Sequence, residues 1–393
     1  MASRKGVILL TILLLQCIVT NGQRVLDINT RLSGQAYASI LTCGPGNEFY
    51  ESFGHSAIRV CDTANSIDIV FNYGMFEFDQ PHFYLKFFHG QLDYFVSAHP
   101  FDEFLFEYDY FGRSVFEQKL KLDSAELQNL FVALCRNIMP ENRYYKYDFF
   151  RDNCATRIRD MIEKSLDGRS LKTDVCPTEE NTYRDLIYKH TEETLLWWRF
   201  GIDLLLGSRC DRPISAWQKM YIPMEMMLQY DTTHIAGGET LTEPTVQLLT
   251  DRRMPASKSI SPTLCFWTLF AVVLLLTLIG RIWKWKLYWV DGILFAVVGI
   301  VSLILTYMWF VSDHWCTKAN LNLIWANPLY LWLLARLRHR NAVVTLIIGC
   351  MLIALLAGWS LWPQHFNSAV LPISLTLAIR LADRFTDKNK YIK

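Results

Sequence analysis

GHSAIRV at residues 54–60 and DNCATR at residues 152–157 are the two stretches that decide the fold of this chain and its chemistry. In the first stretch, His55 begins an alternation of apolar and polar residues, which predicts a β-strand. In the second, Asp152 and Asn153 are both good helix caps, so a helix is predicted to begin at Cys154. The dipole and free N–H groups of a helix N-terminus favour the thiolate of a cysteine placed there. The sequence therefore predicts a thiol nucleophile, with His55 as its base.

The segments around these two stretches predict an α+β domain with an antiparallel sheet plus helices. Strands are expected over residues 36–43 and 66–73, each followed by glycine-containing turn sequence, and over the aromatic-rich segment 87–98. Ser124 is expected to cap a helix over residues 124–137, where leucines recur at helical spacing. Residues 181–230 look helical, and residues 231–260, rich in Thr, Gly, Pro and Ser, are expected to be a linker.

A thiol enzyme also needs a polar group that holds its histidine in one tautomer. Asp68 and Asn72 lie four positions apart on the strand expected after that of His55, so they can share one face. We expect Asp68 to be the third catalytic residue because it lies nearer the turn, with Asn72 as the alternative. Asn72, Asn153 and Arg157 are also candidates for contact with the substrate. Arg157 can bind a phosphate or carboxylate, or pair with an acidic residue on its own helix.

Other kinds of site find little support in the sequence. The ten cysteines include no CxxC pair and no zinc spacing, and His55 with Asp68 lacks a third ligand, so we expect no metal and no other cofactor. A serine mechanism is not indicated, because no GxSxG motif is present. A buried structural role is the common alternative for a single cysteine or a strand histidine. The Asp-Asn-Cys context favours catalysis for Cys154.

The two ends of the chain indicate export and membrane insertion. Residues 1–22 combine a basic start, an apolar run over 7–19 and a small polar exit, which is typical of a signal peptide. Residues 261–393 form a predicted membrane domain of about five helices, two of them short, from apolar runs at about 264–279, 288–311, 321–334, 343–362 and 369–381. Basic residues follow the first, third and fifth runs, and basic loops stay in the cytoplasm. The domain over 23–260 is therefore expected outside the cytoplasm.

The net charge of +1 conceals an acidic outer domain and a basic membrane domain. No basic patch with interleaved aromatic residues indicates a nucleic-acid partner. Polar residues gather on the outward loops 312–320 and 363–367 and inside the third apolar run, where polar groups are costly and often functional. We expect this face to present a lipid headgroup or an acylated substrate to the thiol, or to dock the outer domain. The residues concerned are His314, Asn322, Asn327 and His365.

A strand histidine, a polar group on the next strand and an Asn-Cys pair opening a helix resemble the permuted papain-like thiol enzymes, which include the NlpC/P60 and lecithin:retinol acyltransferase groups. Four segments are similar to the periplasmic domain of the Bacteroides-type lipoprotein N-acyltransferases (Lnb): LTCGPG at 41–46, FGHSAIRV at 53–60, FNYG at 71–74 and YDFFRDNCATR at 147–157. WANP at 325–328 and the trailing helices are similar to the membrane part of that family.

This resemblance implies a bacterial inner-membrane enzyme with its catalytic domain in the periplasm. A fatty acyl chain would pass from a phospholipid, through a thioester on Cys154, to the N-terminal amine of a diacylglyceryl-cysteine lipoprotein. His55 would act as the base, and backbone N–H groups near Cys154 would hold the oxyanion. Three alternatives remain open: a cell-envelope cysteine peptidase or amidase, a phospholipase that passes the acyl group to water, and a non-enzymatic envelope binding module.

Overall fold

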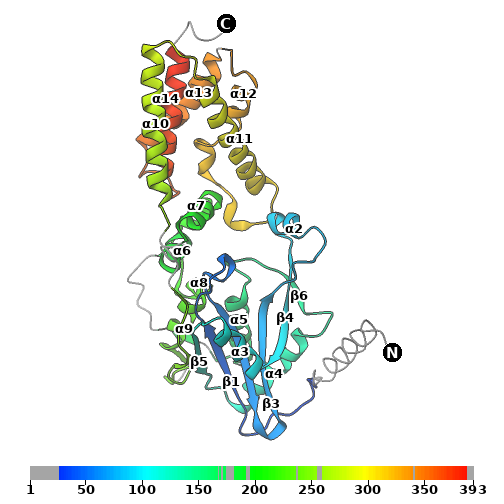
Figure 1. The fold of residues 1–393 in the computed structure, drawn as a ribbon. Coiled ribbons are helices and arrows are strands. Elements are labelled where there is room, and N and C mark those ends of the chain that lie inside the picture. Colours follow the sequence, from blue (N-terminus) through cyan, green and yellow to red (C-terminus); the bar gives the residue numbers. More distant parts are fainter. Residues whose placement is uncertain are drawn as a thin grey trace, which may run out of the picture.

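The computed structural model describes residues 26–386, apart from residues 167, 170, 174–180, 192–194, 236–237, 255–258 and 340. The chain forms a sheet-and-helix part and a helical part, which lie end to end (Figure 1). The predicted signal peptide over residues 1–22 lies outside the described residues.

Seven antiparallel strands form the main sheet, in the order β6-β4-β3-β2-β1-β5-β9. Their bounds are β1 Tyr37–Cys43, β2 His55–Asp62, β3 Ile67–Met75, β4 Asp93–Pro100, β5 Val115–Lys119, β6 Tyr144–Lys146 and β9 Val246–Leu249. A second, two-stranded sheet joins β7 (Leu171–Thr173) to β8 (Thr233–Ile235). The strands that contain His55 and Asn72 are therefore direct neighbours in the centre of the main sheet.

Helices cover both faces of the main sheet, so its strands are buried on two sides. On one face, α4 and α5 pack through Leu130 and Ile158 against Ile40, and on the other, α3 packs through Phe104 against Leu41. Alternate residues of one strand point to opposite faces, which is why Ile40 and Leu41 belong to different cores. The helices of this part are α2 Phe83–His89, α3 Phe101–Tyr110, α4 Ser124–Asn137, α5 Cys154–Ser165, α6 Tyr183–His190, α7 Leu196–Leu205, α8 Ala216–Lys219 and α9 Pro223–Tyr230.

Several sequence expectations need correction in this part. The strand expected over residues 87–98 is the end of α2 followed by β4, because its first half packs as a helical turn closed by Gly90 in the left-handed region. Residues 231–260 are more than a linker, since they supply β8 and the edge strand β9. The cap of α4 is Asp123, which forms a capping box with Glu126.

The helical part contains α10 (Pro262–Ile282), α11 (Tyr288–Phe310), α12 (Leu329–Ala335), α13 (Ala342–Ala357) and α14 (Val370–Thr386). Among the described residues, α10 and α11 are long and apolar enough to cross a membrane, and α13 is a shorter apolar helix. The helix expected over residues 321–334 is not continuous. A 3₁₀ turn at Leu321–Ile324 and the turn at Pro328 precede the seven residues of α12, since proline cannot continue a helix that began before it.

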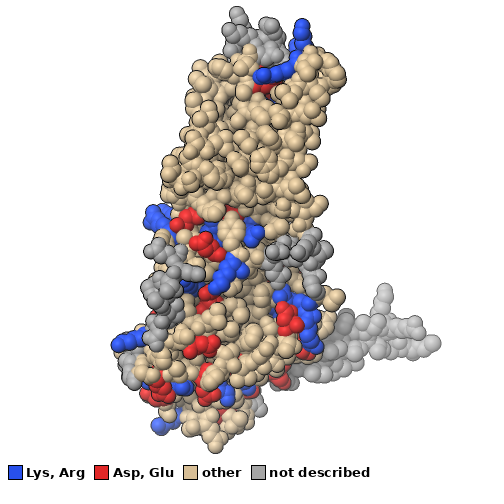
Figure 2. Space-filling model, turned by 90° about the vertical axis from the view of Figure 1, so that its left-hand side faces the viewer, with Lys and Arg blue, Asp and Glu red and all other residues tan. Residues whose placement is uncertain are grey.

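Charges are distributed as a membrane-embedded shape requires. Most of the upper half of the molecule shows no charged side chain on the face in Figure 2, whereas the sheet-and-helix part carries many. The few charges inside the helical part are buried and paired: Arg380 Nε donates to Asp291 at 2.7 Å, and Arg384 Nη1 donates to the same carboxylate at 3.2 Å. Pairing is the ordinary condition for ionised side chains at such a depth.

Candidate active site

His55, Asn72 and Cys154 come together at one end of the main sheet. His55 is the first residue of β2, Asn72 lies on the adjacent strand β3, and Cys154 is the first residue of α5, which packs against both strands. His55 Nε2 donates to Asn72 Oδ1 at 2.5 Å. The His55 ring is also hydrogen-bonded to the Cys154 thiol. Because Nε2 is engaged by the amide, Nδ1 is the ring nitrogen left to take the thiol proton.

The electrostatics of this group favour an ionised thiol. Burial works against the thiolate of Cys154, but the neighbouring His55 ring and the backbone N–H groups of Ser56 and Ala155 lower the pKa of the thiol below its usual range. The pKa of His55 is raised: burial opposes its charge, and the thiolate together with Asn72 outweighs that penalty. Buried cysteines without such partners behave in the opposite way.

Cys43 and Cys135 show this contrast within the same domain. Burial raises the pKa of each thiol to about 12, so both remain protonated and inert near neutral pH. Cys154 is buried to a similar degree, with only 5 % of its surface exposed. The difference therefore comes from the partners of the sulfur atom and not from its depth.

Asp68 does not occupy the position that we expected. It pairs with Cys61 in the β2–β3 register, six residues along β2 from His55, which is roughly 20 Å at the usual rise of a strand. Its carboxylate instead receives two hydrogen bonds from the Arg59 guanidinium, at 2.7 and 2.8 Å. Asn72, which we had kept as the alternative, is the residue that orients His55.

Two residues that we did not single out from the sequence form the wall beside Cys154. Gly74 has a φ of +87°, and a Cβ placed on it would lie 3.6 Å from Cys154 Cβ and 3.7 Å from the Tyr147 ring. The strand must therefore carry a glycine here to let the thiol, the histidine and the tyrosine approach one another. A glycine that ends a predicted strand next to a candidate histidine was the available signal for Gly74. The position of Tyr147 depends on tertiary structure.

The two other candidates around α5 have structural partners. Asn153 caps α5 by accepting from Thr156 N at 2.9 Å, and its Nδ2 donates to Phe149 O and Tyr221 O. Arg157 forms a two-point ion pair with Asp152 and lies 3.5 Å from the centroid of the Tyr145 ring. Both residues hold the start of α5 in place, and their contact with a substrate stays a prediction.

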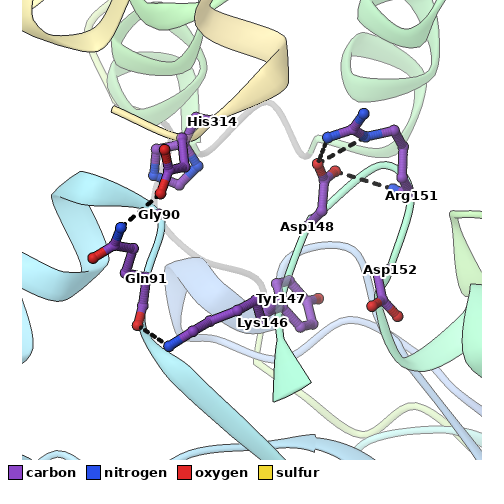
Figure 3. Close-up of a pocket in the computed structure, with 9 residues that line it drawn as sticks. Gly90, Gln91, Lys146, Tyr147, Asp148, Arg151, Asp152 and His314 are labelled. Atoms are coloured by element: carbon purple, nitrogen blue, oxygen red, sulfur yellow. Dashed lines mark hydrogen bonds and ion pairs between the residues drawn. The ribbon is translucent and has the colours of Figure 1, made fainter. Parts of the chain in front are cut away.

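A cavity of about 680 Å³ lies next to this group, at the junction of the two parts of the molecule. Figure 3 shows Gly90, Gln91 and His314 on one side and Asp148 and Arg151 on the other, with Tyr147 between them. The lining residues are Gly90, Gln91, Lys146, Tyr147, Asp148, Arg151, Asp152, Asp313 and His314. Tyr147, which also lies against Gly74, connects this cavity to the thiol.

The polar residues expected at the membrane face are distributed over several places. His314 lines the large cavity and its Nε2 is 2.9 Å from Phe87 O, whereas His365 lines a second cavity of about 350 Å³. Asn322 is buried and donates to Asp203 O and Leu204 O of α7. Asn327 shapes the turn before α12 by accepting from Leu329 N. Only His314 shares a cavity with residues beside Cys154.

Among the described residues, no group of three or more His, Cys, Asp and Glu is arranged to hold a metal ion. The site can therefore be described by its own side chains. A thiol of lowered pKa, a histidine held by an amide and a helix N-terminus together provide a nucleophile, a base and oxyanion donors. Such a group can accept and pass on an acyl chain.

The fold and the site define a membrane-anchored protein of the cell envelope that carries a cysteine–histidine–asparagine site at the junction with its membrane part. Two family models match the chain: the Lnb N-terminal periplasmic domain over residues 27–188 and the Lnb transmembrane domain over residues 255–390. Together these matches span most of the sequence, and the chain belongs to the Lnb family. It matches no protein of curated function and no solved structure.

Membership confirms two expectations from the sequence. The protein is an inner-membrane protein whose N-terminal domain lies in the periplasm, with an antiparallel sheet plus helices followed by a helical membrane domain. Membership also supports a membrane-bound lipoprotein N-acyltransferase in general terms. The catalytic residues, the acyl donor and the order of the steps belong to the proposal below.

Proposed function

We propose that Cys154 is the nucleophile of a lipoprotein N-acyltransferase that works in two half-reactions at one site. The observation that supports this most directly is the hydrogen-bonded series from Cys154 through His55 to Asn72. It combines a thiol that ionises readily with a base whose tautomer is fixed. The alternative role of Cys154 as a buried structural residue does not account for its lowered pKa.

In the first half-reaction, the Cys154 thiolate attacks the carbonyl carbon of an acyl ester of a phospholipid. A carbon–sulfur bond forms, and the oxyanion is held by backbone N–H groups at the start of α5. The ester carbon–oxygen bond then breaks, and the leaving alkoxide takes the proton from the His55 imidazolium. The products are a lysophospholipid and an acyl thioester on Cys154.

In the second half-reaction, the N-terminal amine of a diacylglyceryl-cysteine lipoprotein attacks the thioester carbonyl. A carbon–nitrogen bond forms while the carbon–sulfur bond breaks, and neutral His55 takes a proton from the attacking amine. The thiolate is regenerated, and the lipoprotein carries a new amide. Asn72 keeps His55 Nδ1 directed at the sulfur through both half-reactions.

The cavity beside the thiol is suited to the polar end of such substrates. It mixes cationic groups, Lys146 and Arg151, with the carboxylates of Asp148 and Asp152. Mixed charge of this kind is complementary to a zwitterionic headgroup. Both substrates are confined to one membrane surface by their acyl chains, and confinement raises their effective concentration at a site tethered to that surface.

The experiment that tests this function compares lipoprotein N-termini from cells that carry wild-type protein or Cys154→Ala as their sole copy. We expect triacylated N-termini with the wild type and diacylated N-termini with Cys154→Ala, as read by mass spectrometry. Cys350→Ser is the matched control, because Cys350 is an exposed cysteine of α13. Unchanged triacylation with Cys154→Ala, in cells without a second such enzyme, would refute the proposal.

The same variants separate the alternative functions. A phospholipase would release free fatty acid at full rate in the absence of a lipoprotein acceptor, whereas the transferase needs the acceptor for turnover. A peptidase or amidase would cleave cell-wall peptides without any dependence on phospholipid. A non-enzymatic binding module would keep its cellular phenotype in both Cys154→Ala and His55→Ala.

A further inference from the structure

The helix α2 presents an apolar face to the outside of the molecule. Tyr84 and Leu85 are 77 % and 69 % exposed, and Phe87 and Phe88 are each nearly half exposed. Lys86, on the inward side, is held by Asp93. An exposed patch of large apolar side chains on one short helix is costly in water and typically marks a membrane or protein contact.

The end of α2 is fixed to the periplasmic end of a membrane helix. His89 Nδ1 lies 2.8 Å from the Tyr307 hydroxyl in the last turn of α11, and Asp313 N donates to His89 O at 2.7 Å. Gln91 Nε2 donates to Asp313 Oδ2 at 2.8 Å. Figure 1 shows α2 directly beside the lower end of α11. The height of α2 along the molecule is therefore that of the membrane surface.

The apolar face of α2 continues the surface that α11 exposes to lipid. Phe310 and Val311, at the end of α11, are 67 % and 51 % exposed, and the Trp309 and Phe310 rings are stacked 5.1 Å apart. Aromatic side chains are enriched at the level of lipid headgroups. This continuity with the membrane-facing surface selects lipid, and not a protein, as the occupant of the α2 face.

A row of aromatic rings leads from α2 to the thiol. Phe83 of α2 lies 6.0 Å from the Phe76 ring, Phe76 lies 5.3 Å from Tyr94, and Tyr94 stacks on Tyr147 at 4.3 Å. Tyr147 is the residue that lies next to Cys154 across Gly74. Each of these rings is an apolar surface along which an alkyl chain can lie.

We propose that the outer face of α2 is seated in the outer leaflet of the inner membrane, and that the row from Phe83 to Tyr147 guides an acyl chain from that leaflet to Cys154. The seat in the leaflet stands on the position and exposure of α2. The guiding role rests on the function proposed above. The row then explains how a buried thiol, fixed in a periplasmic domain, can react with an ester whose chains remain in the bilayer.

Photocrosslinking in native membranes tests the seat of α2. Benzoylphenylalanine is introduced in place of Tyr84 or Phe88, and the matched controls carry it in place of Phe106 or Tyr110, which are equally exposed aromatic residues of α3. We expect phospholipid adducts at positions 84 and 88, about tenfold above those at positions 106 and 110. Equal lipid labelling at the two helices, or adducts to protein instead of lipid at α2, would overturn the proposal.

The crosslinking readout is independent of catalysis, and it is repeated in Cys154→Ala. Adducts that persist in that variant support the seat in the leaflet whether or not the proposed function holds. The guiding role is tested with Leu85→Asp/Phe88→Asp and, as control, Phe106→Asp. We expect the α2 variant to acylate lipoprotein about tenfold more slowly, with the alkylation rate of Cys154 by iodoacetamide unchanged. A wild-type acylation rate in this variant would rule out guidance by α2.

Discussion

His55 and Asn72 are joined across two neighbouring strands by a 2.5 Å hydrogen bond between ring Nε2 and amide Oδ1. This contact sets which nitrogen of His55 is directed at Cys154. It also removes the need for a carboxylate in the site, so the imidazolium that forms during the reaction is balanced mainly by the thiolate itself. The relationship leads to distinct expectations for Asn72 and for Asp68.

Asn72→Ala is expected to reduce acyl transfer by about 10- to 100-fold, because the imidazole loses the partner that fixes its tautomer. Asn72→Gln, which keeps the amide on a longer side chain, should recover part of this loss. Asp68→Asn serves as the comparison, since its carboxylate binds Arg59, and it should retain near-wild-type activity. Steady-state transfer rates measured in detergent or nanodiscs provide the check. Equal loss in Asn72→Ala and Asp68→Asn would contradict this assignment.

The reactivity of Cys154 should depend on pH in a way that reveals its partners. Because its pKa is lowered from the ordinary value of about 9, alkylation should already be substantial near neutral pH and should fall as the pH drops through the lowered pKa. In His55→Ala the favourable interaction is gone while burial remains, so the rise in rate should move to higher pH. Iodoacetamide labelling, read on the peptide that contains Cys154, measures both profiles. Identical profiles would show that His55 does not act on the thiol.

Gly74→Ala is expected to impair the site without unfolding the domain. The new methyl group would lie 3.6 Å from Cys154 Cβ, at a φ of +87° that alanine adopts only with strain of roughly 1–2 kcal/mol. We expect a fall in transfer of about tenfold and a lower melting temperature by a few degrees. Gly201→Ala, in α7, is the matched control, because nothing lies within 4 Å of the added carbon. Full activity in Gly74→Ala would mean that the close approach is not needed.

The junction between the two parts depends on Asp203, whose side chain is 1 % exposed. It accepts from Arg184 Nη1 at 2.8 Å, from the Tyr188 hydroxyl and from Asn367 Nδ2 at 2.7 Å, and so joins α6 and α7 to an outward loop of the membrane part. Asp203→Ala leaves Arg184 with less compensation and should cost about 3 kcal/mol. Thermal unfolding in detergent measures this loss. Replacement of the exposed Asp79 by alanine should have little effect, and a similar shift in both variants would contradict the assignment.

Local patterns were sufficient to predict much of this fold. The alternation from His55 predicts β2, and the leucine spacing predicts α4 with its observed bounds. Asn153 before Cys154 predicts the start of α5, because the cap and the helix form within a few residues. These features depend on short-range geometry, which a sequence records directly.

The errors arise where tertiary contacts decide. Asp68 and Asn72 are equivalent by spacing, and only the β2–β3 register, together with Arg59, separates them. The segment at 87–98 is rich in residues that suit strands, yet its beginning packs as part of α2 against the end of α11. Strand β9 joins the sheet edge from a segment whose composition is typical of a linker. No local signal states which distant partner such a segment will find.

The measurement that tests the central claim most directly is the mass of the Cys154 peptide after the protein is incubated with phospholipid alone. We predict a single acyl adduct on Cys154 that is removed by neutral hydroxylamine, as thioesters are, and that disappears when a diacylated lipoprotein is added, in step with the appearance of its N-acyl amide. An N-acylated lipoprotein formed at the wild-type rate by Cys154→Ala, with no adduct on the enzyme, would contradict the account.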